Sequence, residues 1–255
     1  MSSYCADGAI DCHGIVAYSL LSCVREGDEM AGGESAEYLP GDPRYGLNAE
    51  ELKAYYASKP AEWAIYCWDE AGTLEARGTY LQDQRLYVAS FGEQVIGYGH
   101  VVSDDGLNTL GTTYFIQLDD RHAVENFLAA DPLAKAGVYG GVDVHRWSNS
   151  FLKRQADYQR KGLQQFLCTG SKIADTETLL ATHRNDHERY FREYDDSFIF
   201  RGPIRSADGI DNIGTALMLE LPGRAAAEEF WNNEPFVAND GYQDDSRIYR
   251  WVFGD

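Results

Sequence analysis

Most of this sequence repeats itself once at a fixed distance, and that repeat limits the folds open to the chain. When the sequence is shifted by 103 positions, many identical residues fall in register without a gap. Examples are Tyr87 with Tyr190, Gly99 with Gly202, Ser103 with Ser206, Gly111 with Gly214, Leu118 with Leu221, Arg121 with Arg224, Phe127 with Phe230, Pro132 with Pro235 and Tyr139 with Tyr242. A repeat of this kind indicates two homologous modules.

Both modules show the same order of predicted elements: a strand, a helix, two strands around an Asp-Gly turn, a second helix and a last strand. We expect them at 63–68, 73–91, 95–102, 111–118, 121–129 and 141–147, and again at 165–169, 176–194, 198–204, 214–221, 224–232 and 247–253. The order βαββαβ is that of the ferredoxin-like motif, an antiparallel sheet with two helices on one face. Two such sheets can bury their open faces against each other, so we predict an α+β pseudo-dimer with pockets between each sheet and its helices.

The repeat also divides the chain into domains. We assign residues 61–147 to the first module and 163–255 to the second, with a linker at 148–162 that reads as a polar helix. Residues 1–60 form an N-terminal arm of loop-forming composition. Within the arm, residues 15–24 could be a short strand or helix, and 48–58 a short helix that ends before Pro60. A lid over a pocket is one role open to this arm.

The charge balance excludes several classes of partner. The formal net charge is −19, so we expect neither nucleic acid nor an anionic membrane as a partner, because both need clustered Lys and Arg. No basic residue precedes Arg25, and the apolar run near 14–24 is too short to span a bilayer. The five cysteines follow neither a disulfide nor a zinc pattern. These features predict a cytoplasmic protein; a homo-oligomer is left open.

One helix in the second module carries candidate chemistry. In the segment 176–194 the residues Leu180, His183, His187 and Phe191 recur at helical spacing and share one face with neighbouring tyrosines. A histidine that is desolvated on such a face tends to be neutral near pH 7 and can act as a general base. The competing interpretation is a histidine that only packs in the core.

The segment at 129–147, AADPLAKAGVYGGVDVHRW, resembles the closing half of the YCII-related family, and NNEPFVANDGYQDDSRIYRW at 232–251 is a looser version. The resemblance covers about 62–254. It implies the dimeric α+β barrel fold, so the two tandem ferredoxin-like modules are expected to form a pseudo-dimeric α+β barrel. It also implies a site made of a helix histidine and the aspartate of the Asp-Pro pair.

Carried to this sequence, the resemblance pairs His187 with Glu234 in the second module. The first module offers Asp131, but Gln84 stands at the histidine position, and His100 stands where the family has a proline. Since glutamine takes up no proton at neutral pH, we expect one competent site, in the second module, and one degenerate site. Glu234 would fix the tautomer of His187 and raise the basicity of its free nitrogen.

These residues predict a lyase or isomerase that moves protons without a cofactor, for example by dehydration, dehydrohalogenation or lactone isomerisation of a small, aromatic-derived compound. No coupled Ser or Cys nucleophile and no glycine-rich nucleotide loop is apparent, and His183 with His187 lacks the glutamate of a metal-binding helix. The predicted pocket residues are His183, Tyr190, Tyr194, Arg201, Phe236 and Tyr242. The alternatives are a small-ligand-binding or regulatory module and a protein–protein scaffold.

Overall fold

A computed structural model of the chain describes residues 40–173 and 177–255. The chain divides into two compact units, Met1–Asn48 and Ala49–Asp255. In the described part of the first unit, Asp42 binds the guanidinium of Arg44 at 2.6 Å. The predictions for residues 15–24, for the first three cysteines and for a lid formed by the arm lie outside the described residues. The rest of this section concerns the second unit.

The second unit is built around a closed antiparallel barrel. Around the barrel the strands run in the order β1, β3, β2, β8, β5, β7, β6, β4. Their bounds are β1 Glu62–Asp69, β2 Val95–Val102, β3 Thr109–Gln117, β4 Tyr139–Trp147, β5 Gln164–Ser171, β6 Phe198–Arg205, β7 Asn212–Leu221 and β8 Arg247–Phe253. Closure leaves none of these strands with an exposed edge.

The order of strands divides the barrel into two halves that follow the sequence. The first half places β4, β1, β3 and β2 side by side, and the second half places β8, β5, β7 and β6 side by side. The halves join through two short ladders, one between His100 of β2 and Val252 of β8 and one between Trp147 of β4 and Ile204 of β6. The predicted face-to-face arrangement was therefore incomplete, because the sheets also share hydrogen bonds at their edges.

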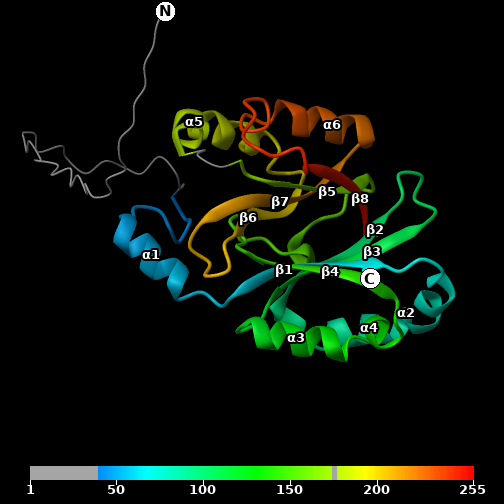
Figure 1. The fold of residues 1–255 in the computed structure, drawn as a ribbon. Coiled ribbons are helices and arrows are strands. Elements are labelled where there is room, and N and C mark those ends of the chain that lie inside the picture. The colour runs from blue at the N-terminus through cyan, green and yellow to red at the C-terminus, as the bar shows by residue number, and fades with distance from the viewer. Residues whose placement is uncertain (1–39, 174–176) are drawn as a thin grey trace, which may run out of the picture. The chain divides into compact units, whose positions relative to one another are not determined.

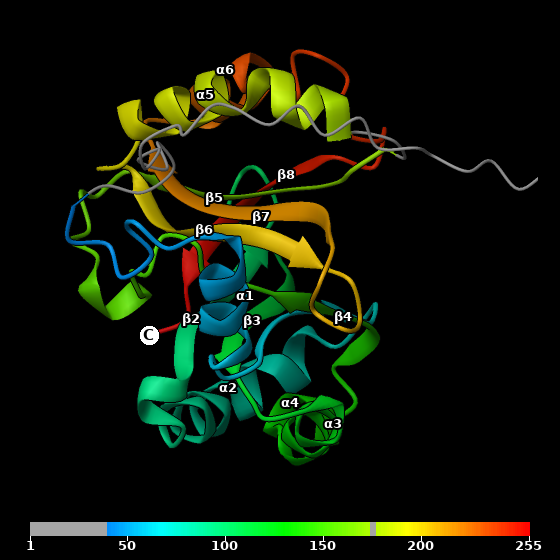
Figure 2. The ribbon, with the colours of Figure 1, turned by 90° about the vertical axis from the view of Figure 1, so that its left-hand side faces the viewer.

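The helices cover the outside of the barrel (Figure 1). The second-half helices α5 and α6 lie on one side of the strands, and the first-half helices α2, α3 and α4 lie on the opposite side, as Figure 2 also shows. Their bounds, with the short helices, are α1 Ala49–Ala57, α2 Leu74–Ala89, η1 Gly92–Gln94, α3 Arg121–Ala130, α4 Pro132–Lys135, η2 Gln155–Asp157, α5 Glu177–Glu193 and α6 Arg224–Asn233. Each half thus has a sheet with helices on its outer face.

The hydrophobic core forms three layers because side chains alternate across each strand. One cluster fills the barrel and draws on both halves, including Phe115, Trp147, Phe200 and Trp251, all essentially unexposed. The other two clusters lie between each half-sheet and its own helices. A functional side chain on an outer sheet face therefore sits in a layer formed by one half alone.

Two glycines of the repeat mark places where backbone and rings approach closely. A Cβ on Gly99 would collide with the Trp251 ring and the Val252 carbonyl, and a Cβ on Gly202 would collide with the backbone of Ser148. Both contacts lie at ladders between the halves. The identity of these two positions in the sequence therefore reflects barrel closure.

Most predicted elements are confirmed, including the short helix before Pro60, which is α1. The short helix α4 was missed; the Asp131 carboxylate caps it by accepting a hydrogen bond from the Leu133 N–H at 2.7 Å. The predicted linker helix at 148–162 is wrong, because only the short turn η2 forms there. The N–H groups of Ser148 and Ser150 instead donate to carbonyls of β6, which holds this segment extended.

Candidate active site

The second half brings the predicted histidine and carboxylate together. His187 lies in the middle of α5, and Glu234 is the residue that ends α6. The Nδ1 atom of His187 is 2.5 Å from Oε1 of Glu234. These residues are 47 positions apart in the sequence, so only the packing of α5 beside the end of α6 makes the contact.

Glu234 is fixed in place before it meets the imidazole. Its side chain is 1% exposed, and Oε2 accepts hydrogen bonds from the N–H groups of Phe236 at 3.1 Å and Val237 at 3.0 Å. Oε1 is left to face His187. Since an ionised carboxylate only accepts hydrogen bonds, Nδ1 carries the hydrogen and donates it. In the neutral imidazole the lone pair then lies on Nε2.

The imidazole of His187 packs against two aromatic rings, and solvent still reaches part of it. The Phe236 ring stacks on it, with centroids 4.3 Å apart, and the Phe191 ring lies at 4.1 Å. The side chain is 21% exposed. Among the described residues, Nε2 has no hydrogen-bond partner. A small molecule that reaches this nitrogen would meet an oriented lone pair.

Two of the predicted pocket tyrosines contribute to packing between the helices. The Tyr190 hydroxyl donates to the Phe230 carbonyl at 2.9 Å, and its ring stacks on the Phe230 ring at 5.8 Å. The Tyr194 ring meets the same Phe230 ring edge-on at 4.8 Å. Both side chains thus contact α6.

The other predicted pocket residues lie at different distances from the pair. The guanidinium of Arg201 lies 4.8 Å from the Phe191 ring, which itself contacts His187. The Tyr242 ring packs against the Trp231 ring, with centroids 5.6 Å apart. Burial, followed by the charge of Glu234, raises the pKa of the Tyr242 hydroxyl. His183 makes no hydrogen bond or ion pair with the described residues.

The first half replaces this pair with a closed network of hydrogen bonds. Gln84 and Asp131 are both fully buried. Gln84 donates to the hydroxyls of Tyr114 at 2.6 Å and Tyr139 at 2.7 Å, and accepts from Tyr98 at 3.0 Å. The Tyr114 hydroxyl in turn donates to Asp131. Burial raises the pKa of Tyr114 and of Tyr139, which keeps these hydroxyls protonated as donors.

His100, the third predicted member of the first site, lies beside an ion pair and makes no hydrogen bond to Gln84 or Asp131 in the described part of the chain. Its Nδ1 faces Arg77 at 3.5 Å and Thr112 at 3.3 Å, and Arg77 binds Asp69 at 2.5 Å. Burial, followed by the charges of Arg77 and Arg85, lowers the pKa of His100 to about 3. The imidazole is therefore neutral at physiological pH. Because the guanidinium only donates, Nδ1 accepts and Nε2 carries the hydrogen.

Sequence reasoning missed most of these first-half groups. Asp69, Arg77, Tyr98 and Tyr114 come from four different elements, and their contacts span up to 35 positions. The available signal was their place on predicted inward faces, together with the shift of 103 positions, which puts Tyr98 opposite Arg201 and Asp69 opposite Lys172.

The comparison with protein families finds a match in the first half of the barrel. Residues 61–148 match the family model described as the YCII-related domain. The match covers the half that contains Gln84 and ends before the half that contains His187. No curated protein matches the chain in sequence.

Solved structures resemble the chain in fold. A 5-chloro-2-hydroxyhydroquinone dehydrochlorinase from Burkholderia phenoliruptrix, in complex with 2,5-dihydroxybenzoquinone, gives a TM-score of 0.33 at 22% identity, over 35% of this chain and 95% of that one. A mutant chlorite dismutase from Candidatus Nitrospira defluvii, in complex with cyanide, superposes with a TM-score of 0.52 at 9% identity, over 80% of this chain and 95% of that one. The likeness to this second structure shows that the chain has the dimeric α+β barrel fold in one polypeptide.

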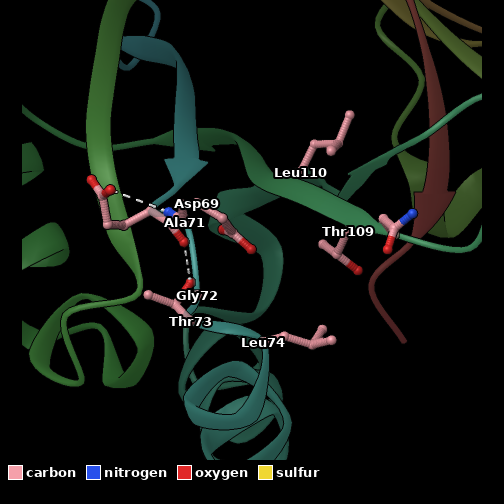
Figure 3. Close-up of a pocket in the computed structure, with 9 residues that line it drawn as sticks. Asp69, Ala71, Gly72, Thr73, Leu74, Thr109 and Leu110 are labelled. Atoms are coloured by element: carbon pink, nitrogen blue, oxygen red, sulfur yellow. Dashed lines mark hydrogen bonds between the residues drawn. The ribbon is translucent and has the colours of Figure 1, made fainter.

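The first half of the barrel also has a small cavity at the start of α2 (Figure 3). Its volume is about 240 Å³, and Asp69, Gly72 and Thr73 line it on one side, with Thr109 and Leu110 on the other. The Asp69 carboxylate already binds Arg77 behind it. The buried Gln84 and Asp131 do not line this cavity.

The part of the chain that the structure describes contains no set of side chains that could bind a metal ion. No group of three or more His, Cys, Asp or Glu side chains there is arranged to hold an ion. His183 and His187 thus have no third ligand among the described residues. None of the helices in residues 40–173 and 177–255 combines the length and apolar character needed to cross a membrane.

Proposed function

We propose that this protein is a small-molecule enzyme that transfers protons through His187 and Glu234, as a lyase or isomerase that needs no cofactor. The observation that supports it is the pair itself: a buried carboxylate held by two backbone N–H groups, 2.5 Å from one nitrogen of an imidazole whose other nitrogen is free to react. A carboxylate that only stabilised the core would not require a hydrogen bond to an imidazole that is partly exposed to solvent.

The chemistry follows from the tautomer. Glu234 accepts the Nδ1 hydrogen, so the Nε2 lone pair can take a proton from a carbon next to a carbonyl group. The electron pair of the broken C–H bond moves into an enolate. The imidazolium that forms lies against the negative charge of Glu234, which stabilises it. Returning the proton to another carbon completes an isomerisation, and loss of hydroxide or halide from the enolate completes an elimination.

We also propose that the two halves are tandem ferredoxin-like modules, at 61–147 and 163–255, of which only the second kept a working site. Three observations support this: the strand order is the same in both halves, Gln84 and His187 are 103 positions apart, and so are Asp131 and Glu234. Asp131 and Glu234 each accept backbone N–H groups at the start of the next turn. The substrate in this proposal is a small organic compound, aromatic-derived among the candidates, and the location is the cytoplasm.

The proposal can be tested before the substrate is known. The protein is incubated in D₂O with a panel of cyclic ketones, lactones and hydroxylated quinones, and deuterium incorporation is followed by NMR. We expect exchange at one carbon of at least one compound. His187→Asn removes the base, and a general base contributes about 10²- to 10⁴-fold, so exchange should fall to near the background rate.

A matched histidine variant controls for surface effects. His122→Asn changes a histidine of α3 whose side chain is 79% exposed, and exchange should be unchanged. If a compound binds saturably but no carbon exchanges in the wild-type protein, the chain is a ligand-binding module and the enzymatic proposal is wrong. If exchange persists in His187→Asn, the base is another residue.

A further inference from the structure

The two halves carry opposite charges at one equivalent position next to the helix layer. In the first half, Asp69 ends β1 and pairs with Arg77 of α2. A shift of 103 positions puts Lys172 opposite Asp69 and Leu180 opposite Arg77. The second half has therefore lost the internal ion pair and holds a cation in its place.

Lys172 follows β5 and is half-buried, on the face of the sheet that α5 and α6 cover. Its ammonium makes no hydrogen bond or ion pair with any residue that the structure describes. Burial, followed by the charges of Arg205 and Arg184, lowers the pKa of Lys172 to about 8. The backbone N–H of Lys172 donates to the Ile213 carbonyl of β7 at 2.9 Å, and the adjacent Asn212 pairs with Arg205 of β6. Lys172 and Arg205 thus lie in neighbouring parts of the sheet, in a chain whose net charge is −19.

This cationic cluster, Lys172, Arg184 and Arg205, is connected to the His187 pair in two ways. Arg184 precedes His187 by three residues on α5, so the two side chains are neighbours on the helix surface. The backbone of Lys172 is bridged to Tyr242, and the N–H of Ile173 donates to the Gly241 carbonyl at 3.3 Å. The N–H of Gly241 donates at 2.7 Å to the carbonyl of Phe236, whose ring stacks on His187. The cluster and the imidazole therefore belong to one region of the second half.

We propose that the cationic cluster binds a carboxylate group of the substrate and so directs the neighbouring C–H bond toward His187. This inference rests on the proposed function and adds the substrate class, an organic acid. Ammonium and guanidinium groups form their strongest hydrogen bonds with anionic oxygens. A bound carboxylate would also neutralise the charge that makes a half-buried Lys172 costly. Because the net charge of the chain is negative and repels anions, an organic acid requires a local positive site in order to bind.

The test uses benzoate as the probe, with benzamide as its neutral isostere and phenyl phosphate as a second anion, and measures affinity by titration calorimetry. We expect benzoate to bind at least tenfold more tightly than benzamide, since hydrogen bonds to charged groups are worth about tenfold or more in affinity. Lys172→Met should remove about tenfold of benzoate affinity. Lys172→Arg should restore it, and Lys135→Met, at an exposed lysine of α4, should change nothing.

The outcomes separate this inference from the proposed function. Equal benzoate affinity in wild type and Lys172→Met, or tight binding of phenyl phosphate alone, overturns the carboxylate site; His187-dependent exchange in a neutral ketone would then still support the enzyme. His187→Asn should keep its benzoate affinity while losing deuterium exchange. Benzoate affinity that depends on Lys172, with no exchange in any compound, supports the anion site and overturns the enzyme.

Discussion

In the second half of the barrel a buried carboxylate holds an imidazole that solvent reaches, whereas in the first half the equivalent carboxylate is enclosed by tyrosine hydroxyls. Glu234 is bound to His187, which is 21% exposed, while Asp131 accepts from Tyr114, which is 1% exposed. Both acids are positioned by the backbone N–H groups that follow them. This difference supports the proposed function, in which only the carboxylate of the second half takes part in chemistry.

The largest expected effect is on activity, from neutralising each acid in turn. Glu234→Gln keeps the shape but removes the charge that stabilises the imidazolium, so the deuterium exchange rate should fall about 10²- to 10⁴-fold. Asp131→Asn, its counterpart, should leave the rate within about twofold, since the first half contributes no base. Equal losses in both variants, measured by NMR exchange, would contradict the division of roles.

The second prediction concerns stability, for which the acid of the first half is expected to matter more than the acid of the second half. Asp131→Ala removes the cap of α4 and strands the buried Tyr114 hydroxyl, and unsatisfied buried groups cost about 1–3 kcal/mol each. We expect a loss of about 4 kcal/mol in the free energy of unfolding, measured by urea denaturation. Glu234→Ala should cost about 2 kcal/mol, because water can reach the exposed side of His187. A larger loss for Glu234→Ala would break the comparison.

The third prediction is a pH effect that belongs to the first half. The pKa of His100 is about 3 in the folded protein, below its unfolded value, so below about pH 6.5 the unfolded chain binds more protons. Folding stability is unaffected by His100 above that pH and falls as the pH drops from there toward 3. From about pH 7.5 to 5 the wild type should lose about 2 kcal/mol more than His100→Gln.

This pH effect is checked by urea unfolding at each pH. His100→Gln keeps a polar side chain opposite Arg77 and Thr112 but does not titrate. If the two proteins show the same dependence on pH, His100 is not the group responsible, and the half-buried His145, whose pKa burial also lowers, becomes the candidate.

The smallest expected effect comes from giving the first half the residue of the second. Gln84 donates two hydrogen bonds and accepts one, while a neutral imidazole offers one donor and one acceptor. Gln84→His should therefore lower the free energy of unfolding by about 1–2 kcal/mol and create no new exchange activity. A second exchange activity by NMR, found in Gln84→His and absent from Gln84→Ala, would show that this half is open to substrate.

Several features of the fold could be predicted because they are local. The helix around His187 followed from apolar residues at helical spacing, and the strands on either side of each Asp-Gly turn from short apolar runs. The linker at 148–162 could not be predicted, because its polar sequence suits a helix and only the edge of β6 decides that it is extended. Tertiary hydrogen bonds there outweigh a weak local preference.

The candidate site divides in the same way. His187 and Glu234 were named from the resemblance; Tyr190 and Tyr194 contact Phe230, and the pocket roles expected for them stay predictions. An inward-facing aromatic ring on a helix can meet a sheet or a second helix, and periodicity does not distinguish the two. Lys172 gave no signal until its strand position could be compared with that of Asp69.

The sequence by itself determined the repeat and the order of elements in each half, since these depend on spacing along one chain, and its resemblance to the YCII-related family pointed to His187 and Glu234. Only the tertiary structure decided how the halves join, that β2 meets β8 and β4 meets β6, and that the imidazole bound to Glu234 stays within reach of solvent. Those outcomes depend on the shapes of side chains from distant segments, above all Tyr98 and Tyr114 around Gln84 and Phe191 and Phe236 around His187. Burial is a property of the packed assembly, and no single stretch of sequence specifies it.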